Sequence, residues 1–163
     1  MTHAAGGARL IIVCGLPGAG KTTLARELET RSAAVRLDAD EWMEALAIDL
    51  YDEAGRAKIE SLQWRVGQEL LKRGLTVIIE WGTWARAERD ALRLGARALG
   101  AAVELRHVSA PAEALFDRIS RRGREDPPIT RDALLGWVAA FQTPTREEAA
   151  LFDPPLDPGP LDS

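Results

Sequence analysis

Short apolar runs recur along the chain and predict four β-strands. The first covers Arg9–Cys14, the second Ala34–Leu37 and the third Leu75–Glu80, while Val103–Val108 alternates between apolar and polar residues. Near-continuous apolarity is typical of a strand covered on both faces, so we expect the third strand at the centre of a sheet. The alternation of the fourth strand indicates a position nearer the edge.

Stretches with apolar residues at helical spacing separate and follow these strands. The longest carries an apolar stripe of Ile59, Leu62, Val66 and Leu70 and ends before Gly74, a common residue after a helix. The expected helices cover residues 22–31, 41–50, 56–73, 86–99, 112–121 and 131–141.

Strands that alternate with helices predict an α/β fold, a three-layer α/β/α sandwich with a central parallel sheet. Residues 9–150 form its one domain, after a flexible leader at residues 1–8. Residues 151–163 are rich in proline and aspartate and poor in apolar side chains, so we expect a disordered or loosely packed tail. Ligands of such sheets bind beyond the carboxyl ends of the strands.

The segment Gly15–Thr22, GLPGAGKT, follows the first strand directly and fits the phosphate-loop pattern G-x-x-x-x-G-K-[ST] in every fixed position. Glycines let the backbone N–H groups point inward around a phosphate, and the next helix adds its positive N-terminal end. A glycine-rich turn that matches by chance is the alternative, and the strand before the motif argues against it. The chain is expected to bind ATP through Gly15, Pro17, Gly18, Ala19, Gly20, Lys21, Thr22 and Thr23.

The composition excludes some classes of protein but indicates no particular function. The chain has 163 residues, 46% of them hydrophobic and 28% charged, with a net charge of −4 that gives no general attraction to nucleic acids or anionic membranes. Cys14 is the single cysteine, so no internal disulfide forms. Residues 1–8 do not resemble a signal peptide, and no apolar run approaches the roughly 18 residues of a membrane span, so we expect a cytoplasmic protein.

Carboxylates follow the second and third strands, at the rim where the phosphate loop lies. Phosphoryl transfer to a hydroxyl group needs a carboxylate that accepts the acceptor's proton, and Asp38 and Asp40 are both candidates. Asp40 is alternatively only the N-cap of the next helix. Glu80 is either a solvated strand end or a ligand of Mg²⁺; Thr22, Asp38 and Glu80 form the expected magnesium site.

Arginines gather near the end of one expected helix, at Arg118, Arg121, Arg122 and Arg124. The planar guanidinium group suits phosphate oxygens, and residues 118–129 are expected to close as a lid over the nucleotide. A solvated basic helix end is the alternative.

Five tryptophans are many for this length. Trp64 and Trp137 lie in helical stripes and are expected in the core, whereas Trp42, Trp81 and Trp84 follow strand ends on the rim. These three either pack in the core or stack against an acceptor molecule.

With these residues in place, the sequence resembles the small P-loop kinases of the zeta-toxin, chloramphenicol phosphotransferase and polynucleotide 5′-kinase group. Asp38-Ala39-Asp40 is similar to the D-x-D of this group, in which the second carboxylate activates the acceptor, and this implies that role for Asp40. Arg118, Arg121 and Arg122 resemble the lid arginines of the group, which implies that Arg118 and Arg122 act in catalysis and that Arg121 binds nucleotide.

Two positions depart from the polynucleotide kinases. The turn after the third strand reads Glu80-Trp81-Gly82 instead of an Asp-Thr-Asn-like sequence, and Met43 stands where those kinases have a basic residue. These departures leave the acceptor open. Because the rim is rich in tryptophan and the net charge is negative, we expect a Mg²⁺-dependent ATP phosphotransferase whose acceptor is the hydroxyl group of a small molecule. A kinase of RNA or DNA 5′-hydroxyl ends and an ATP-binding switch or ATPase are the alternatives.

Overall fold

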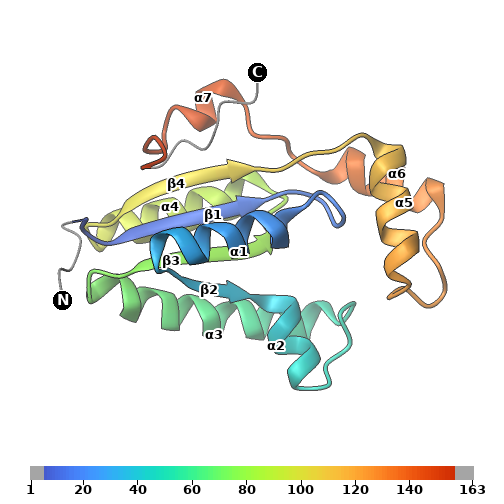
Figure 1. Cartoon of the computed structure of the whole chain (residues 1–163), viewed down its shortest axis with the longest axis horizontal. Coiled ribbons are helices and arrows are strands. Elements are labelled where there is room, and N and C mark those ends of the chain that lie inside the picture. The colour runs from blue at the N-terminus through green and yellow to red at the C-terminus, as the bar shows by residue number, and fades with distance from the viewer. Residues whose placement is uncertain (1–5, 157–163) are drawn as a thin grey trace.

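The centre of the molecule is a sheet of four parallel strands in the order β2-β3-β1-β4 (Figure 1). This computed structural model describes residues 6–156. The strands are β1 (Arg9–Cys14), β2 (Val35–Asp38), β3 (Thr76–Gly82) and β4 (Ala102–His107). Their order confirms the central position expected for the third strand and the edge position expected for the fourth.

Helices connect consecutive strands and continue after the last one. Within the described residues none is long and apolar enough to cross a membrane. The helices are α1 (Lys21–Ser32), α2 (Ala39–Ala45), α3 (Glu53–Lys72), α4 (Arg86–Ala98), α5 (Ala112–Arg122), α6 (Arg131–Ala140) and α7 (Arg146–Ala149).

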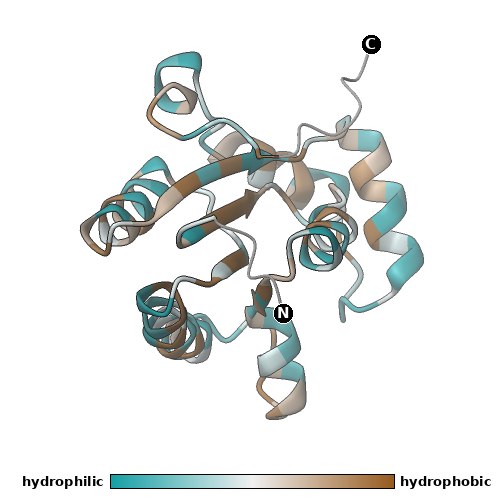
Figure 2. Cartoon of the chain, turned by 60° about the vertical axis from the view of Figure 1, so that its left-hand side comes forward, coloured by the Kyte–Doolittle hydropathy of each residue, from teal (hydrophilic) through white to brown (hydrophobic). Residues whose placement is uncertain are grey.

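Alternate residues of β1 serve the two faces of the sheet. Leu10 and Ile12 pack with residues of α3 and α4, whereas Ile11 and Val13 pack with residues of α1. All four are at most 3% exposed. Figure 2 shows the largely apolar strands between helices whose surfaces mix polar and apolar residues. The expected three-layer α/β/α sandwich is confirmed.

Only part of the apolar stripe expected on the buried face of α3 is in fact buried. Ile59 is buried, but Leu62 and Val66 are 48% and 42% exposed, and the buried face continues through Gln63 and Gly67 instead. Gly67 brings the helix close to the sheet, because a Cβ atom there would already contact side chains of β2 and β3. The residues that let α3 approach the sheet closely are therefore buried, and the larger apolar side chains of Leu62 and Val66 beside them stay exposed.

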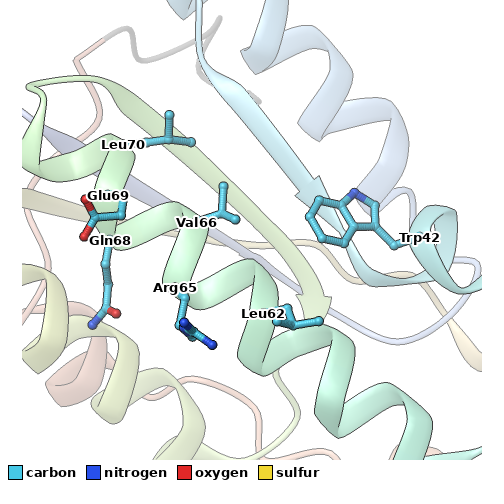
Figure 3. Close-up of a pocket in the computed structure, with 7 residues that line it drawn as sticks. All are labelled: Trp42, Leu62, Arg65, Val66, Gln68, Glu69 and Leu70. Atoms are coloured by element: carbon cyan, nitrogen blue, oxygen red, sulfur yellow. The ribbon is translucent and has the colours of Figure 1, made fainter.

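The exposed apolar residues of α3 line a shallow groove of about 720 Å³ on the outside of the molecule. Figure 3 shows Leu62, Val66 and Leu70 along one side of α3, with Trp42 of α2 across from them. Trp42 was expected on the rim with the phosphate loop; it lines this separate groove instead.

The first turn of α2 differs from its expected start. The helix covers residues 39–45 rather than 41–50, and its N-cap is Asp38, whose side chain accepts a hydrogen bond of 2.9 Å from the backbone N–H of Asp40. The interpretation of Asp40 as an N-cap is therefore wrong. Its carboxylate is left for other partners.

The packed part of the domain extends beyond residue 150. The Asp153 N–H donates to Val103 O, its carboxylate accepts from the Val103 N–H at 2.7 Å, and Arg97 pairs with the same oxygen at 2.6 Å. The half-buried Phe152 packs on the core cluster around β1 and α4. Of the expected leader and tail, residues 1–5 and 157–163 lie outside the described residues.

Candidate active site

The phosphate loop connects β1 to α1 at the carboxyl end of the sheet. Gly15 passes so close to Val108 O that a Cβ atom would clash with it, and Gly20 has a φ of 103° directly before α1. Both positions require glycine because of this geometry. The Lys21 ammonium donates to Gly15 O at 2.9 Å, and burial lowers the pKa of Lys21, opposed by the nearby carboxylates of Glu80 and Asp40.

Two expected magnesium ligands lie in contact. The Thr22 hydroxyl donates to a carboxylate oxygen of Glu80, which joins the start of α1 to β3. Asp38 is linked to Glu80 through Arg36, whose Nη1 atom lies 3.2 Å from Asp38 and 3.1 Å from Glu80. Burial is the main cause that raises the pKa of both carboxyl groups.

This oxygen set suits a magnesium ion held mainly by phosphates. Mg²⁺ keeps several waters and takes few protein ligands when it binds with a nucleotide. A hydroxyl and a carboxylate in contact beside the phosphate loop fit that chemistry. The described residues contain no group of three or more acidic, His or Cys side chains that would cage a cation unaided.

Arg36 belongs to the site although the motifs gave it no role. Besides Asp38 and Glu80, it pairs with Glu41 at 2.5 Å and Glu29 at 3.4 Å. A signal was present in the sequence: residues 36 and 38 lie two apart on one strand and therefore point to the same side. No sequence spacing indicated the contacts of Arg36 with Glu29, Glu41 and Glu80, which lie on other elements.

Asp40 faces the cleft and is 46% exposed, unlike the buried Asp38. Arg56 of α3 donates to its Oδ1 atom at 2.6 Å, a strong charge-assisted contact. On its other side the Arg56 guanidinium lies 4.0 Å from Glu60. Burial raises the pKa of Glu60 to about 7, offset in part by Arg56. Neither Arg56 nor Glu60 was identified from the sequence.

The arginines of α5 lie opposite the carboxylates. Arg118 donates to Gly18 O of the phosphate loop at 2.9 Å, and Arg121 and Arg122 line the same cleft. Arg124 reaches across to Glu44 near the end of α2 at 3.4 Å. Figure 1 shows α5 beyond the carboxyl ends of β1 and β4.

Tryptophans form part of the cleft wall, but not the set that we expected. Trp81 and Trp84 line the cleft, and Trp81 donates its indole N–H to Gln63 at 2.6 Å. Trp137, expected only in the core, also lines the cleft, with its ring 6.2 Å from that of Trp84.

A buried arginine holds the segment after β3 in place. Arg89 is 0% exposed and donates to Thr83 O at 2.7 Å and to Gln142 O at 2.7 Å. Its charge is matched by Glu148, also fully buried, at 2.6 and 3.0 Å. The pair joins α4 and α7 behind the cleft wall, which makes Arg89 a structural residue.

One cleft of about 1440 Å³ lies at the carboxyl end of the sheet. It is lined by the phosphate loop, the carboxylates after β2 and β3, the start of α3 and the arginines of α5. Such a cleft has room for a nucleotide and a second molecule side by side. A phosphate loop, arginines facing it and an accessible carboxylate are parts that phosphoryl transfer uses.

The chain is similar in sequence and in structure to known kinases. Shikimate kinase from Mesorhizobium japonicum is 29% identical over 133 residues, which are 78% of this chain and 61% of that protein. The chain thus spans less than two thirds of the length of that relative. A sugar kinase structure from Janibacter sp. HTCC2649 has a TM-score of 0.62 at 26% identity, over 87% of this chain and 82% of that chain.

The structure of the Pnkp1/Rnl/Hen1 RNA repair complex has a TM-score of 0.68 at 24% identity, over 93% of this chain and 48% of that chain. At this identity the likeness shows the fold alone. The model of the AAA_33 family, described as an AAA domain, matches residues 10–144. The chain belongs to this AAA domain family, with the P-loop kinase-like fold that the sequence predicted.

Proposed function

We propose that the protein is a Mg²⁺-dependent phosphotransferase that moves the γ-phosphate of ATP to a hydroxyl group of a small molecule. The observation that carries the proposal is that Asp40 and the phosphate loop face one cleft, with Asp40 close enough to Lys21 to affect its pKa. A carboxylate in that position faces an acceptor whose oxygen points at the terminal phosphate.

The phosphate loop and the lid supply positive charge where the reaction develops negative charge. Backbone N–H groups of the loop and the Lys21 ammonium hold the outer phosphates, and Arg118 and Arg122 approach from α5. Arg121 binds the nucleotide from the same helix. Charge placed in advance on both sides stabilises the transferring phosphoryl group.

Magnesium is the expected partner of the β- and γ-phosphates. When bound, it neutralises charge on the phosphate oxygens. The Thr22 hydroxyl and the Glu80 carboxylate would hold it, with Asp38 accepting from a water in its shell. Arg36 keeps both carboxylates in place.

Asp40 is the group that receives the proton. The acceptor oxygen forms a bond to the γ-phosphorus while the bond between that phosphorus and the β–γ bridging oxygen breaks, and the hydroxyl proton moves to Asp40. The Arg56 guanidinium donates to the Asp40 carboxylate at 2.6 Å and so fixes its position in the cleft. Arg56 is thus a positioning residue for Asp40.

A small molecule is favoured over a nucleic acid as acceptor. The named relatives include a shikimate kinase and a sugar kinase. Met43, which stands where polynucleotide kinases have a basic residue, is 0% exposed and packs against Ile59, so this position offers the acceptor no contact. The RNA repair complex among the structural neighbours keeps a 5′-hydroxyl kinase as the second candidate.

The proposal is tested by incubating the protein with Mg²⁺ and ATP in the presence of pooled metabolites, antibiotics, nucleosides and 5′-hydroxyl oligonucleotides. ADP release and the mass of any product are measured together. We expect ADP formation that depends on a small-molecule acceptor and a product heavier by one phosphoryl group. Phosphate released only to water would support the ATPase alternative, and phosphorylated oligonucleotide ends would support the second candidate.

A further inference from the structure

The two halves of the cleft carry opposite charge. The half formed by the phosphate loop and α5 contains Lys21 and the arginines of the lid. The half formed by α2, α3 and the segment after β3 is lined by carboxylates. These are Asp40, Glu53, Glu60 and Glu88.

Arg56 is the one cation that the described residues place in this second half. Its guanidinium is already engaged, at 2.6 Å by Asp40 and at 4.0 Å by Glu60. One arginine cannot balance Asp40, Glu53 and Glu88, whatever the protonation state of Glu60, so this half of the cleft keeps an excess of negative charge.

Glu60 lies among these carboxylates. Its side chain is 26% exposed, and the carboxylates of Glu88 and Asp40 are close enough to act on it. Burial is the main cause that raises the pKa of Glu60 to about 7. Arg56, which lies 4.0 Å from it, lowers this pKa only in part. A cation bound in the cleft would supply the missing counter-charge.

Indole rings complete this half of the cleft. Trp81 and Trp84 line it. The indole N–H of Trp81 is occupied by Gln63, which leaves the ring as the surface that a ligand meets. Aromatic faces attract ammonium groups and the C–H faces of sugar-like molecules.

The carboxylates do not form a metal site. Within residues 6–156, no three acidic, His or Cys side chains are arranged to hold a metal ion. Carboxylates spread along a cleft wall beside aromatic rings suit a larger organic cation.

We propose that this half of the cleft binds an acceptor that carries a protonated amine beside its hydroxyl group, as amino sugars and amino alcohols do. The inference rests on the proposed phosphotransferase function and names the class of its acceptor. The same carboxylates would repel phosphorylated and carboxylated acceptors, so the site would select amine-bearing acceptors against acidic ones.

The experiment compares related acceptors whose amine is charged, neutralised or replaced by an acid. Amino sugars and aminocyclitols are offered with ATP and Mg²⁺ beside their N-acetylated forms, which are neutral, and beside sugar acids. Product mass and kcat/KM are measured for each, and binding of the free amines is followed by calorimetry with a non-hydrolysable ATP analogue. We expect kcat/KM for free amines to exceed that of the acetylated forms by about 10-fold or more, as one added charge contact gives.

Glu60→Gln should reduce this preference, whereas Glu69→Gln, which removes the same charge from α3 outside the cleft, should keep it. Equal kcat/KM for free and acetylated amines, or faster transfer to sugar acids, overturns the inference and leaves the phosphotransferase function intact. Phosphate release to water alone with every acceptor overturns the proposed function and the inference with it. Free amines that bind but receive no phosphate, while neutral acceptors do, also overturn the inference.

Discussion

At the scale of single residues, Asp38 and Asp40 have different surroundings although one residue separates them. Asp38 is 9% exposed, caps α2 and shares Arg36 with Glu80. Asp40 is half exposed and meets Arg56 on the acceptor side of the cleft. One carboxylate is therefore built into the scaffold, and the other is available to a substrate.

Replacing each aspartate by asparagine should separate their roles. Asp40→Asn is expected to keep the affinity for ATP and the thermal stability but to lower kcat by about 10²–10⁴-fold, as the loss of a general base does. Asp38→Asn should weaken binding of Mg²⁺ and ATP as well. Calorimetry and turnover on both variants are the measurement. An active Asp40→Asn beside an inactive, ATP-binding Asp38→Asn would mean that the base is Asp38.

Glu60 predicts a dependence of stability on pH that does not involve catalysis. Its pKa is about 7 in the folded protein and 4.5 when exposed, so folding favours the protonated form. Its stabilising contribution is present below about pH 4.5 and is lost as the pH rises through 7. Glu60→Gln should therefore raise the free energy of unfolding by about 1–3 kcal/mol at about pH 8 and change it little at about pH 4.5. Urea denaturation at both pH values measures this; a variant less stable at the higher pH would show that Glu60 is stabilised as an anion.

At the scale of elements, α4 and α7 are joined by the buried pair of Arg89 and Glu148. Removing one partner of such a pair leaves an uncompensated charge in the interior. Arg89→Leu should thus destabilise the protein by about 3–5 kcal/mol. The control is Glu69→Gln, which breaks exposed pairs with Lys72 and Arg73 and should change the free energy of unfolding little. Similar losses from both substitutions would mean that the buried pair adds nothing of its own.

The proposed lid is the second element with a testable property. The segment from Arg118 to Ile129 begins in α5, where Ile119 is buried against the phosphate loop. Its polar contacts include Arg118 with Gly18 O and the exposed pair of Arg124 and Glu44. We expect trypsin to cleave after these arginines in the free protein and to be slowed by an ATP analogue with Mg²⁺. Equal cleavage rates with and without nucleotide would count against closure of this segment.

The sequence predicted helices and strands well where residues close together in the chain determine them. The strands and most helices lie within a few residues of their expected bounds, because apolar runs, glycines and caps act over short distances. The buried face of α3 was not predicted correctly, because Gln63 and Gly67 are buried through contacts with the sheet. The partners of Arg36, Arg56 and Arg89 lie 44, 16 and 59 residues away in Glu80, Asp40 and Glu148, which no local pattern encodes.

At the scale of the whole molecule, the phosphate loop, the carboxylates and the lid arginines come from distant parts of the chain and meet at one end of the sheet. Parallel strands bring their carboxyl ends together, which is why the sequence placed Lys21, Asp40 and Glu80 on one rim. The opposite charges of the two cleft halves emerge only when α3 and α5 face each other. This arrangement supports a nucleotide on one side and an acceptor on the other.

The central claim is tested most directly by following the γ-phosphate of labelled ATP in the presence of Mg²⁺ and an acceptor identified by the screen. With the wild-type protein the label should appear in the acceptor. Lys21→Ala should lower this transfer by about 100-fold or more, with unchanged Tm, because the cation that faces the transferring phosphate is lost. Label that appears only as free phosphate, or undiminished transfer by Lys21→Ala, would contradict the account.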